Sequence, residues 1–357
     1  MAIRLPAVVG SIVEAALTPH PVDRYLELVD PMLTWRDLRA EVIEATHPTD
    51  RTLRLVLRPT RQWKGHQAGQ YVQVSTVING VRQTRCFSPS NASSTPRGDI
   101  ELLITVNDDG IVSKHLRHTA KPSTVLGLSQ AAGEFTLPAE LGEQAVFISG
   151  GSGITPVLSM LRTLLAEGYA GQIVFIHYAR SPQDVAYLDE LGRLASQNSN
   201  LDLRLRYTRG PGGRHFDAED LIGVSDNAQI FLCGPSSLMD AVTDRYDELG
   251  LTGRLHSEAF TLTPAVTIDP NEPITGELTF TASGRSTTND GRTILEQAEA
   301  AGLSPEHGCR MGICFSCTKT KKTGCTRNVL TGDIDTEADK PIQLCINAPV
   351  GDVEIEV

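Results

Sequence analysis

The sequence predicts a multidomain protein with an antiparallel β-barrel, an α/β domain built on a parallel sheet, and a smaller α+β domain. Residues 38–138 hold short alternating strands between Gly, Asn and Pro turns, which is typical of a small antiparallel barrel. Residues 139–261 alternate buried-strand patterns, of which 145–149 is a wholly apolar run, with helical patterns, which favours a parallel sheet covered by helices. After a polar linker at residues 262–273, a strand pair, a helix and a cysteine-rich loop follow at residues 274–357.

Composition narrows the function classes before any motif is considered. The chain has 357 residues, of which 40% are hydrophobic and 21% charged, and no stretch has the length of a membrane span. Residues 1–37 are expected to be an N-terminal extension, and they match neither a signal peptide nor a transit peptide. The net charge of −11 argues against nucleic acid as a partner. We expect a cytoplasmic protein with reduced thiols.

The barrel prediction depends on four strands. Each combines β-branched or aromatic residues with polar alternation and ends at a turn signal. The predicted strands are residues 52–57, 71–76, 82–88 and 100–106.

The middle domain is predicted from its order of elements. Strands are expected at residues 145–149, 173–178, 201–207 and 229–233, with helices at residues 155–167, 185–195 and 236–249. The run Gly150-Gly151-Ser152-Gly153 lies between the first strand and the first helix, for which Thr155 is the expected cap and Pro156 lies in the first turn. Such a loop brings backbone N–H groups and a helix dipole to a pyrophosphate. Because the run departs from G-x-G-x-x-G, a purely structural turn stays open.

Two further loops open on the same edge of the predicted sheet. Cys233-Gly234-Pro235 ends the strand at residues 229–233, and ligands of parallel sheets bind at carboxyl ends of strands. The alternative for Cys233 is a small buried residue. Arg180 and Ser181 follow the second strand, where a cation and a hydroxyl favour the extra phosphate of NADPH over NADH, unless they form a solvated loop.

Four cysteines carry the strongest motif in the chain. Their spacing, C-x4-C-x2-C followed by a distant cysteine, is that of a plant-type [2Fe–2S] site. Gly308 and Gly312 allow the loop to turn sharply. A disulfide or a structural zinc site is the alternative, and zinc fits this spacing poorly. Cys325 is expected to be a non-ligand thiol, because Cys345 leads into the final strand. The predicted iron ligands are Cys309, Cys314, Cys317 and Cys345.

Together these residues resemble the ferredoxin–NADP reductase superfamily, specifically members with a C-terminal [2Fe–2S] ferredoxin domain, over residues 38–357. The resemblance implies a flavin-binding barrel, an NAD(P)-binding domain and a β-grasp ferredoxin domain. The family motif R-x-Y-S is present as Arg85-Cys86-Phe87-Ser88, with Phe replacing Tyr. It implies that Arg85 holds a flavin phosphate, Phe87 lies against the ring, and Ser88 hydrogen-bonds near its reactive nitrogen.

The resemblance also assigns the remaining site residues. The second flavin-phosphate motif, G-x-x-S, matches Gly110-Ile111-Val112-Ser113. The nicotinamide-nucleotide loop includes Gly151, Gly153 and Thr155, and Cys233-Gly234-Pro235 is the nicotinamide-side loop. Glu258 and Phe260 fall where the family places an acidic and an aromatic residue near the flavin. The implied catalytic residues are Ser88, Cys233 and Glu258.

The resemblance implies three redox groups: FAD rather than FMN, NADPH rather than NADH, and one [2Fe–2S] cluster. A nicotinamide releases two electrons as hydride and a cluster accepts one at a time, so a flavin is needed between them. A plant-type cluster has a potential of about −400 mV, which is low enough to reduce many acceptors. No triad or carboxylate pair suggests hydrolysis.

The chain contains no oxygenase domain, so a separate protein is expected to receive the electrons. The extension and the stretch at residues 65–71 are similar to reductases of membrane fatty-acyl desaturases and alkane hydroxylases. The alternatives are a Rieske-type ring- or steroid-hydroxylating oxygenase as acceptor, or a permanent electron-transfer subunit of a larger enzyme. We expect a monomer that does not span a membrane but is able to dock on a membrane-bound partner.

Overall fold

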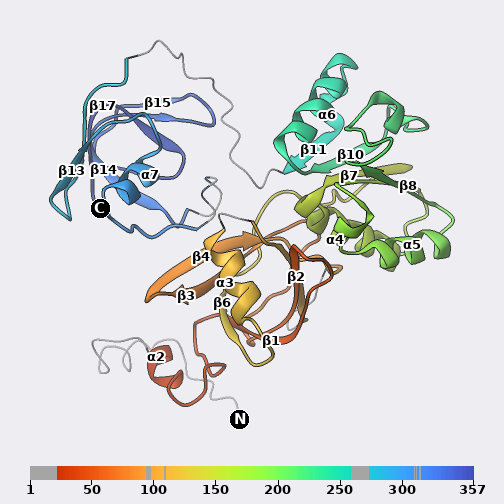
Figure 1. The fold of residues 1–357 in the computed structure, drawn as a ribbon, viewed down its shortest axis with the longest axis horizontal. Coiled ribbons are helices and arrows are strands. Elements are labelled where there is room, and N and C mark those ends of the chain that lie inside the picture. The colour runs from red at the N-terminus through yellow and green to blue at the C-terminus, as the bar shows by residue number, and fades with distance from the viewer. Residues whose placement is uncertain are drawn as a thin grey trace.

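The computed structural model describes residues 22–93, 98–107, 110–258, 273–308, 310, 312 and 315–357. Its strands form three sheets, one in each predicted domain (Figure 1). Within these ranges, no helix is both long and apolar enough to cross a bilayer. Several predicted features lie outside the described residues: residues 1–21 of the extension, residues 262–272 of the linker, and the side chains of Phe260, Cys309 and Cys314.

The first sheet is antiparallel and curls into the predicted barrel. Its strand order is β4-β3-β6-β1-β2-β5. The two edge strands meet through a bridge between Pro89 and Leu102, and the Ser90 N–H donates to the Glu101 carbonyl at 2.8 Å. The strands are β1 (Arg39–Thr46), β2 (Thr52–Pro59), β3 (Val72–Ile78), β4 (Val81–Phe87), β5 (Ile100–Thr105) and β6 (Val125–Leu128).

Two of these strands and one helix were not predicted. In β1 the inward residues include Ala40, a weak strand former, and the strand carries three charged residues. The strand β6 has four residues, and Gly127 lies so close to β3 that a Cβ there would meet the Ser75 hydroxyl at 2.1 Å. The helix α3 (Ile111–Thr119) covers one end of the barrel and buries Val112 and Leu116.

The second sheet is parallel, in the order β11-β10-β7-β8-β9, which confirms the predicted α/β domain. Alternate residues face two helical layers: Phe147 packs in one core with helices α4 and α5, and Ile148 packs in the other with α6. The strands are β7 (Gln144–Gly150), β8 (Gln172–Ala179), β9 (Leu201–Tyr207), β10 (Gln229–Cys233) and β11 (Leu255–Glu258). The helices are α4 (Ile154–Ala166), α5 (Leu188–Gln197) and α6 (Ser236–Glu248).

The prediction of Thr155 as a helix cap is wrong. The helix α4 begins at Ile154, and its N-cap is Gly153, which offers no side chain to the first turn. The Thr155 hydroxyl lies inside that turn and donates to the Ser152 carbonyl at 3.2 Å. The first N–H groups of α4 therefore lack a side-chain cap at the end of the glycine loop.

The third sheet confirms the predicted α+β domain. Its order is β13-β12-β17-β14-β15, with β16 paired to β14; the β12–β17 pair is parallel and the other pairs are antiparallel. Thr293 and Glu296 form a capping box at the start of the helix that the structure describes in this domain. The elements are β12 (Glu277–Phe280), β13 (Arg285–Thr288), α7 (Ile294–Ala300), β14 (Thr318–Asn328), β15 (Ile334–Asp335), β16 (Lys340–Gln343) and β17 (Asn347–Ile355).

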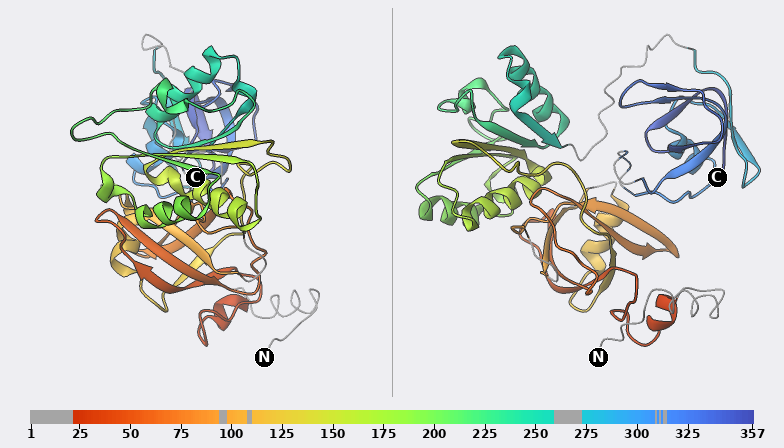
Figure 2. Two further views of the ribbon diagram at one scale, coloured as in Figure 1. Left: turned by 90° about the vertical axis from the view of Figure 1, so that its right-hand side faces the viewer. Right: turned by 180° about the vertical axis from the view of Figure 1, so that it is seen from behind.

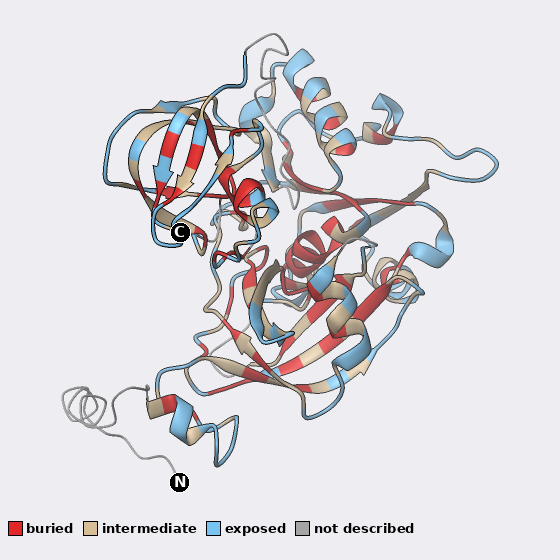
Figure 3. Ribbon diagram, turned by 60° about the vertical axis from the view of Figure 1, so that its left-hand side comes forward, coloured by how far each residue is buried: buried red, intermediate tan, exposed pale blue. Residues whose placement is uncertain are grey.

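The barrel and the parallel-sheet domain share one packed interface. The helix α4 lies between the two sheets and is largely buried there, as the red helix in Figure 3 shows. The barrel residues Ala68, Leu103 and Phe135 belong to its hydrophobic core. Arg162 of α4 donates to Glu101 of β5 at 2.7 Å and to Glu190 of α5 at 2.7 Å. Burial alone would raise the pKa of Glu101, but the Arg162 charge and hydrogen bonds lower it to about 2. An ionic contact therefore fixes the two domains together.

Part of the extension is tied to the barrel. The short helix α2 (Val22–Leu26) carries Asp23, whose carboxylate is buried. This carboxylate accepts the backbone N–H groups of Arg36 at 2.9 Å and Asp37 at 2.8 Å, as well as that of Trp35. These bonds fix the chain just before β1.

We predict that Arg162→Met destabilises the protein by about 3–5 kcal/mol, because it leaves the Glu101 carboxylate buried without its main partner. The loss should be full above pH about 4.5, and it should shrink as the pH falls toward 2 and the native carboxylate is protonated. Urea denaturation across this range measures it. Arg58→Met is the matched control, because the Arg58–Asp99 pair is exposed and should contribute at most about 1 kcal/mol. Equal effects of the two substitutions would contradict the prediction.

Candidate functional site

The predicted flavin motif lies at the end of β4, beside the other two domains. Phe87 pairs with Val72 of β3 and is half-buried against the barrel core. Ser88 is buried, and its hydroxyl has no hydrogen-bond partner among the described residues. The Arg85 guanidinium donates to the carbonyls of Thr84 at 2.7 Å and Gly308 at 3.0 Å.

Glu258 approaches the same region from the parallel sheet. A Cβ placed on Gly133 would lie 3.1 Å from the Tyr71 ring and 3.9 Å from a Glu258 carboxylate oxygen, so this carboxylate faces the barrel. Tyr71 precedes Val72, the strand partner of Phe87, and therefore lies beside Ser88. The second Glu258 oxygen is buried and has no partner among the described residues. Burial raises the pKa of Glu258 to about 7.

Cys233 is brought to Glu258 by sheet register. The two residues are partners in the parallel pair β10–β11. The Cys233 side chain is fully buried; its burial and the nearby Glu258 charge raise the pKa of the thiol well above its usual value. The thiol is therefore neutral at pH 7. The predicted catalytic residues Ser88, Cys233 and Glu258 thus gather where the barrel meets the parallel sheet.

The two predicted nucleotide loops touch each other. A Cβ on Gly153 would lie 2.1 Å from the Cys233 carbonyl oxygen, and one on Gly234 would lie 3.0 Å from the Gly150 nitrogen. Only glycine permits this approach. Gly151 differs, because its φ is +54° and open space surrounds its Cβ position. Gly151 and the uncapped start of α4 are therefore accessible to a ligand, whereas Gly153 holds the loops together.

The second flavin motif forms the start of α3. Gly110 is the N-cap and provides no side-chain cap, and the Ser113 hydroxyl donates to the Gly110 carbonyl at 3.4 Å. The Val112 side chain is in the barrel core, so only its backbone is left for a ligand. A helix start with uncapped N–H groups suits a phosphate.

A second basic residue lies beside Arg180. A pocket of about 150 Å³ between the barrel and the parallel sheet is lined by Gly151, Arg180 and Asp184. Arg180 is exposed at the end of β8, and its carbonyl accepts the Arg209 N–H at 3.1 Å. The Ser181 hydroxyl donates to Asp184 at 2.6 Å. Arg209 was not among the predicted site residues. It comes two residues after the strand at 201–207, at the same sheet edge as Arg180.

The cysteine loop brings two predicted iron ligands together. Cys317 and Cys345 are 1% and 2% exposed, and the Leu344 N–H donates to the Cys317 carbonyl at 3.2 Å. The Gln343 amide donates to the carbonyl of Gly312, where φ is +78°. Cys325 lies in β14, eight residues after Cys317, and pairs with Val350 of β17. The rise of a strand over eight residues separates the two cysteines by roughly 25 Å. This placement favours Cys345 over Cys325 as the fourth ligand.

The cysteine loop faces the flavin motif. Besides the Arg85–Gly308 bond, the Ser316 hydroxyl donates to the Gln73 side chain of β3 at 3.3 Å. Figure 2 shows the C-terminal domain approaching the barrel near β3 and β4, while the parallel-sheet domain stands apart from it.

The chain matches two protein-family models. Residues 40–137 match the oxidoreductase FAD-binding domain and residues 147–244 the oxidoreductase NAD-binding domain. An NADPH oxidoreductase of Mycobacterium tuberculosis is 30% identical over 95% of this chain and 90% of the relative. A glycine betaine monooxygenase reductase subunit of Pseudomonas aeruginosa is 31% identical over 81% of this chain and 86% of the relative.

Among solved structures, phthalate dioxygenase reductase has a similar fold, with a TM-score of 0.65. The two chains are 23% identical, and the match covers 90% of this chain and 98% of that one. This similarity extends over all three sheets and confirms the multidomain fold.

The residues at the domain boundary fit FAD. The unpartnered oxygens of Ser88 and Glu258 are buried acceptor or donor groups that a flavin ring would satisfy. The uncapped start of α3 and the Arg85 guanidinium suit its phosphates.

We predict that Glu258→Gln stabilises flavin-depleted protein above pH 7 by up to about 3 kcal/mol, because the folded protein raises the pKa of this carboxyl from 4.5 to about 7. Folded protein then binds the extra proton, so native stability should fall between pH about 4.5 and 7 and level off above 7. Urea midpoints at pH 5 and pH 8 measure the difference. Glu248→Gln, at an exposed position of α6, should change neither midpoint. A pH profile unaltered by Glu258→Gln would refute the assignment.

Proposed function

Because the chain belongs to the ferredoxin–NADP reductase superfamily and is an oxidoreductase with FAD- and NAD-binding domains, we propose that it passes electrons from NADPH through FAD and a [2Fe–2S] cluster to a separate oxygenase. One observation carries the proposal: Arg85 of the flavin motif bonds to Gly308, the residue before Cys309. The flavin strand and the cysteine loop are therefore in contact. The proposed domains are residues 38–138 for flavin, 139–261 for NADPH and 274–357 for the cluster.

The flavin end is proposed to use Arg85, Phe87 and Ser88 of the barrel. When bound, FAD would accept two electrons as one hydride and release them one at a time. Arg85 and the backbone of residues 110–113 would hold its phosphates, and Phe87 would lie against its ring. Ser88 would hydrogen-bond the reactive edge, and the Glu258 carboxyl, with a pKa of about 7, would hold a proton beside it. Phe260 is assigned near the flavin by resemblance alone.

The nicotinamide nucleotide is proposed to enter along the carboxyl edge of the parallel sheet. The start of α4, near Gly151 and Thr155, would receive its pyrophosphate, and Cys233-Gly234-Pro235 would face the nicotinamide. Arg180 and Arg209 offer two positive charges to a 2′-phosphate, against one negative charge on Asp184. Ser181 would exchange its Asp184 bond for the phosphate. The name of the mycobacterial relative supports NADPH.

The cluster is proposed to be held by Cys309, Cys314, Cys317 and Cys345. Cys317 directly precedes β14 and Cys345 follows β16 at the same end of this antiparallel pair, and both side chains belong to one buried core. This domain would supply one-electron transfer to the acceptor.

The acceptor is proposed to be a membrane fatty-acyl desaturase or alkane hydroxylase, on the similarity of residues 65–71 and of the extension. A Rieske-type ring- or steroid-hydroxylating oxygenase is the second candidate, and the similarity to a glycine betaine monooxygenase reductase subunit supports an oxygenase of some kind as the acceptor. A permanent subunit of a larger enzyme is the third. Product formation with purified candidate oxygenases and NADPH distinguishes them. We propose a cytoplasmic monomer that docks on its partner.

We predict that Cys345→Ser abolishes the visible absorption of the cluster and NADPH-dependent cytochrome c reduction. Ferricyanide reduction should persist, since the residues proposed to contact the flavin ring and NADPH lie in the barrel and in the parallel-sheet domain. Absorption spectra and both assays measure this outcome. Cys325→Ser is the matched control and should leave all three signals unchanged, because Cys325 lies along β14. Loss of the cluster in Cys325→Ser instead would reassign the ligand.

We predict that Arg209→Gln raises the KM for NADPH about tenfold, the effect of losing one charged hydrogen bond of about 1.4 kcal/mol. The KM for NADH should hardly change, because NADH lacks the 2′-phosphate. Steady-state ferricyanide assays with both nucleotides measure the ratio. Arg193→Gln, at an exposed position on α5, serves as the control. A parallel rise for both nucleotides would show that Arg209 does not contact the 2′-phosphate.

A further inference from the structure

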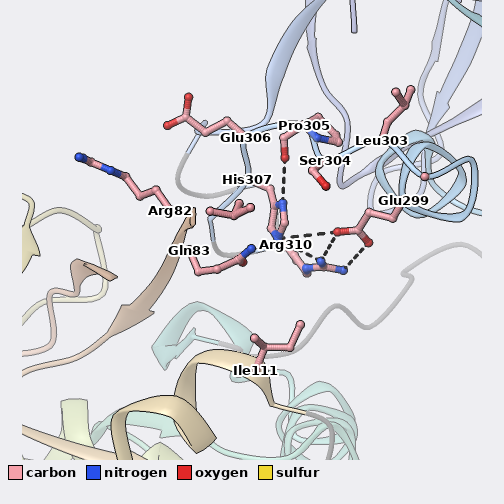
Figure 4. Close-up of a pocket in the computed structure, with 12 residues that line it drawn as sticks. Arg82, Gln83, Ile111, Glu299, Leu303, Ser304, Pro305, Glu306, His307 and Arg310 are labelled. Carbon is pink, nitrogen blue, oxygen red and sulfur yellow. Dashed lines mark hydrogen bonds and ion pairs between the residues drawn. The ribbon is translucent and has the colours of Figure 1, made fainter. Parts of the chain in front are cut away.

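A large pocket lies between the barrel and the C-terminal domain. Its volume is about 880 Å³, and we call it the interdomain pocket. The barrel contributes β4 and the first residue of α3, and the C-terminal domain contributes the end of α7 and the chain that follows (Figure 4). The residues that the argument uses are Arg82, Gln83, Ile111, Glu299, Ser304 and Arg310.

Two polar atoms in the pocket wall are buried without a partner among the described residues. One is the side-chain oxygen of Gln83, an acceptor, and the other is Nε of Arg310, a donor. Figure 4 shows Gln83 reaching from β4 toward the residues of the C-terminal domain. Buried polar atoms are rarely left unpaired, because each lost hydrogen bond costs about 1–3 kcal/mol. A ligand that offers both a donor and an acceptor would satisfy both atoms.

The pocket adjoins the proposed flavin-phosphate site. Ile111 lines it and directly follows Gly110, the N-cap of α3. Gln83 and Arg85 lie two residues apart on β4, so their side chains share one face about 7 Å apart. Arg85 itself bonds to Gly308 of the C-terminal domain. A group attached to the flavin phosphate would therefore lead into the interdomain pocket.

The charges in the pocket favour a neutral group over a free anion. The Arg310 guanidinium forms a bidentate ion pair with Glu299. Both ring nitrogens of His307 already have partners, the Pro305 carbonyl and Arg310. Arg82 adds one exposed positive charge at the barrel rim and Glu306 one exposed negative charge. The wall therefore offers hydrogen bonds and apolar contact with little net charge.

We propose that the interdomain pocket holds the adenosine end of FAD, so that the C-terminal domain forms one wall of the flavin site. The proposal rests on the flavin site proposed above. Adenine presents an amino donor and ring-nitrogen acceptors, which match the Gln83 oxygen and the Arg310 Nε. Arg82 would lie toward the second phosphate. The C-terminal domain thereby selects the dinucleotide flavin over FMN.

Titration of the flavin-depleted full-length chain with FAD and with FMN tests the inference by flavin fluorescence. The wild type should bind FAD at least tenfold more tightly than FMN. Gln83→Leu removes the acceptor, and Ser304→Trp fills the pocket from the C-terminal domain. Each should weaken FAD binding about tenfold, equivalent to about 1.4 kcal/mol, and leave FMN affinity unchanged. The FMN affinity reports that the barrel is folded and its flavin-ring site intact.

Two control variants place the same side chains elsewhere. Gln197→Leu at the end of α5 and Ser283→Trp at the β12–β13 turn lie outside the pocket and should bind FAD normally. Equal wild-type affinities for FAD and FMN would overturn the inference. Pocket variants that weaken binding of both flavins alike, or of neither, would also overturn it. In each of these cases the proposed function, oxidation of NADPH through a flavin, would still stand. Failure of the wild type to bind either flavin would instead refute the proposed function.

Discussion

The buried contact between Glu101 and Arg162 is the constraint on which the site depends. It joins β5, an edge strand of the barrel sheet, to the middle of α4, and the Ser90 hydroxyl and the Tyr187 hydroxyl both bond to Glu101. The start of the same helix is the uncapped end of the glycine loop. One rigid helix thus fixes the nucleotide loop relative to the strand that precedes Ser90. In hydride transfer the distance between the donor atom and the acceptor atom must be held closely. A rigid connection between the two domains meets this requirement.

Local sequence pattern predicted the strands of the parallel sheet whose apolar residues follow a clear period. The strand at 229–233 matches the structure at both ends because its apolar run is buried and ends at Gly234-Pro235, and the edge strand at 201–207 matches because its apolar and polar residues alternate. The strand β6 and helix α3 escaped prediction, since four residues with a glycine carry almost no periodicity. The prediction that four cysteines are iron ligands came from their spacing alone. Arg209 and the raised pKa of Glu258 depend on which strands are neighbours and how deeply they are buried, and neither is local in sequence.

The chemistry of the boundary follows from low charge. Cys233 is neutral because its thiol is buried, and Glu258 is about half protonated at pH 7 for the same reason. Two fixed negative charges beside a bound flavin ring would oppose its reduction, because the ring gains negative charge when it accepts hydride. A buried hydroxyl and a neutral carboxyl instead donate hydrogen bonds toward developing negative charge. The unpaired oxygens of Ser88 and Glu258 are therefore consistent with a site organised for a bound ring.

The third domain is attached in a different way. The first two domains share a hydrophobic core and a network of ion pairs, whereas the cysteine loop meets the barrel through the Arg85–Gly308 and Ser316–Gln73 hydrogen bonds beside a large pocket. Among the described residues, one bond from a charged guanidinium and one between neutral groups contribute about 2–4 kcal/mol together. A cluster that must receive electrons from the flavin and then deliver them to another protein needs a contact of this strength, since a domain locked by a buried ion pair would keep its cysteine loop covered. The interface between the barrel and the parallel-sheet domain is therefore rigid, which suits hydride transfer. The interface between the barrel and the C-terminal domain is weaker, which suits a domain that has to meet a partner.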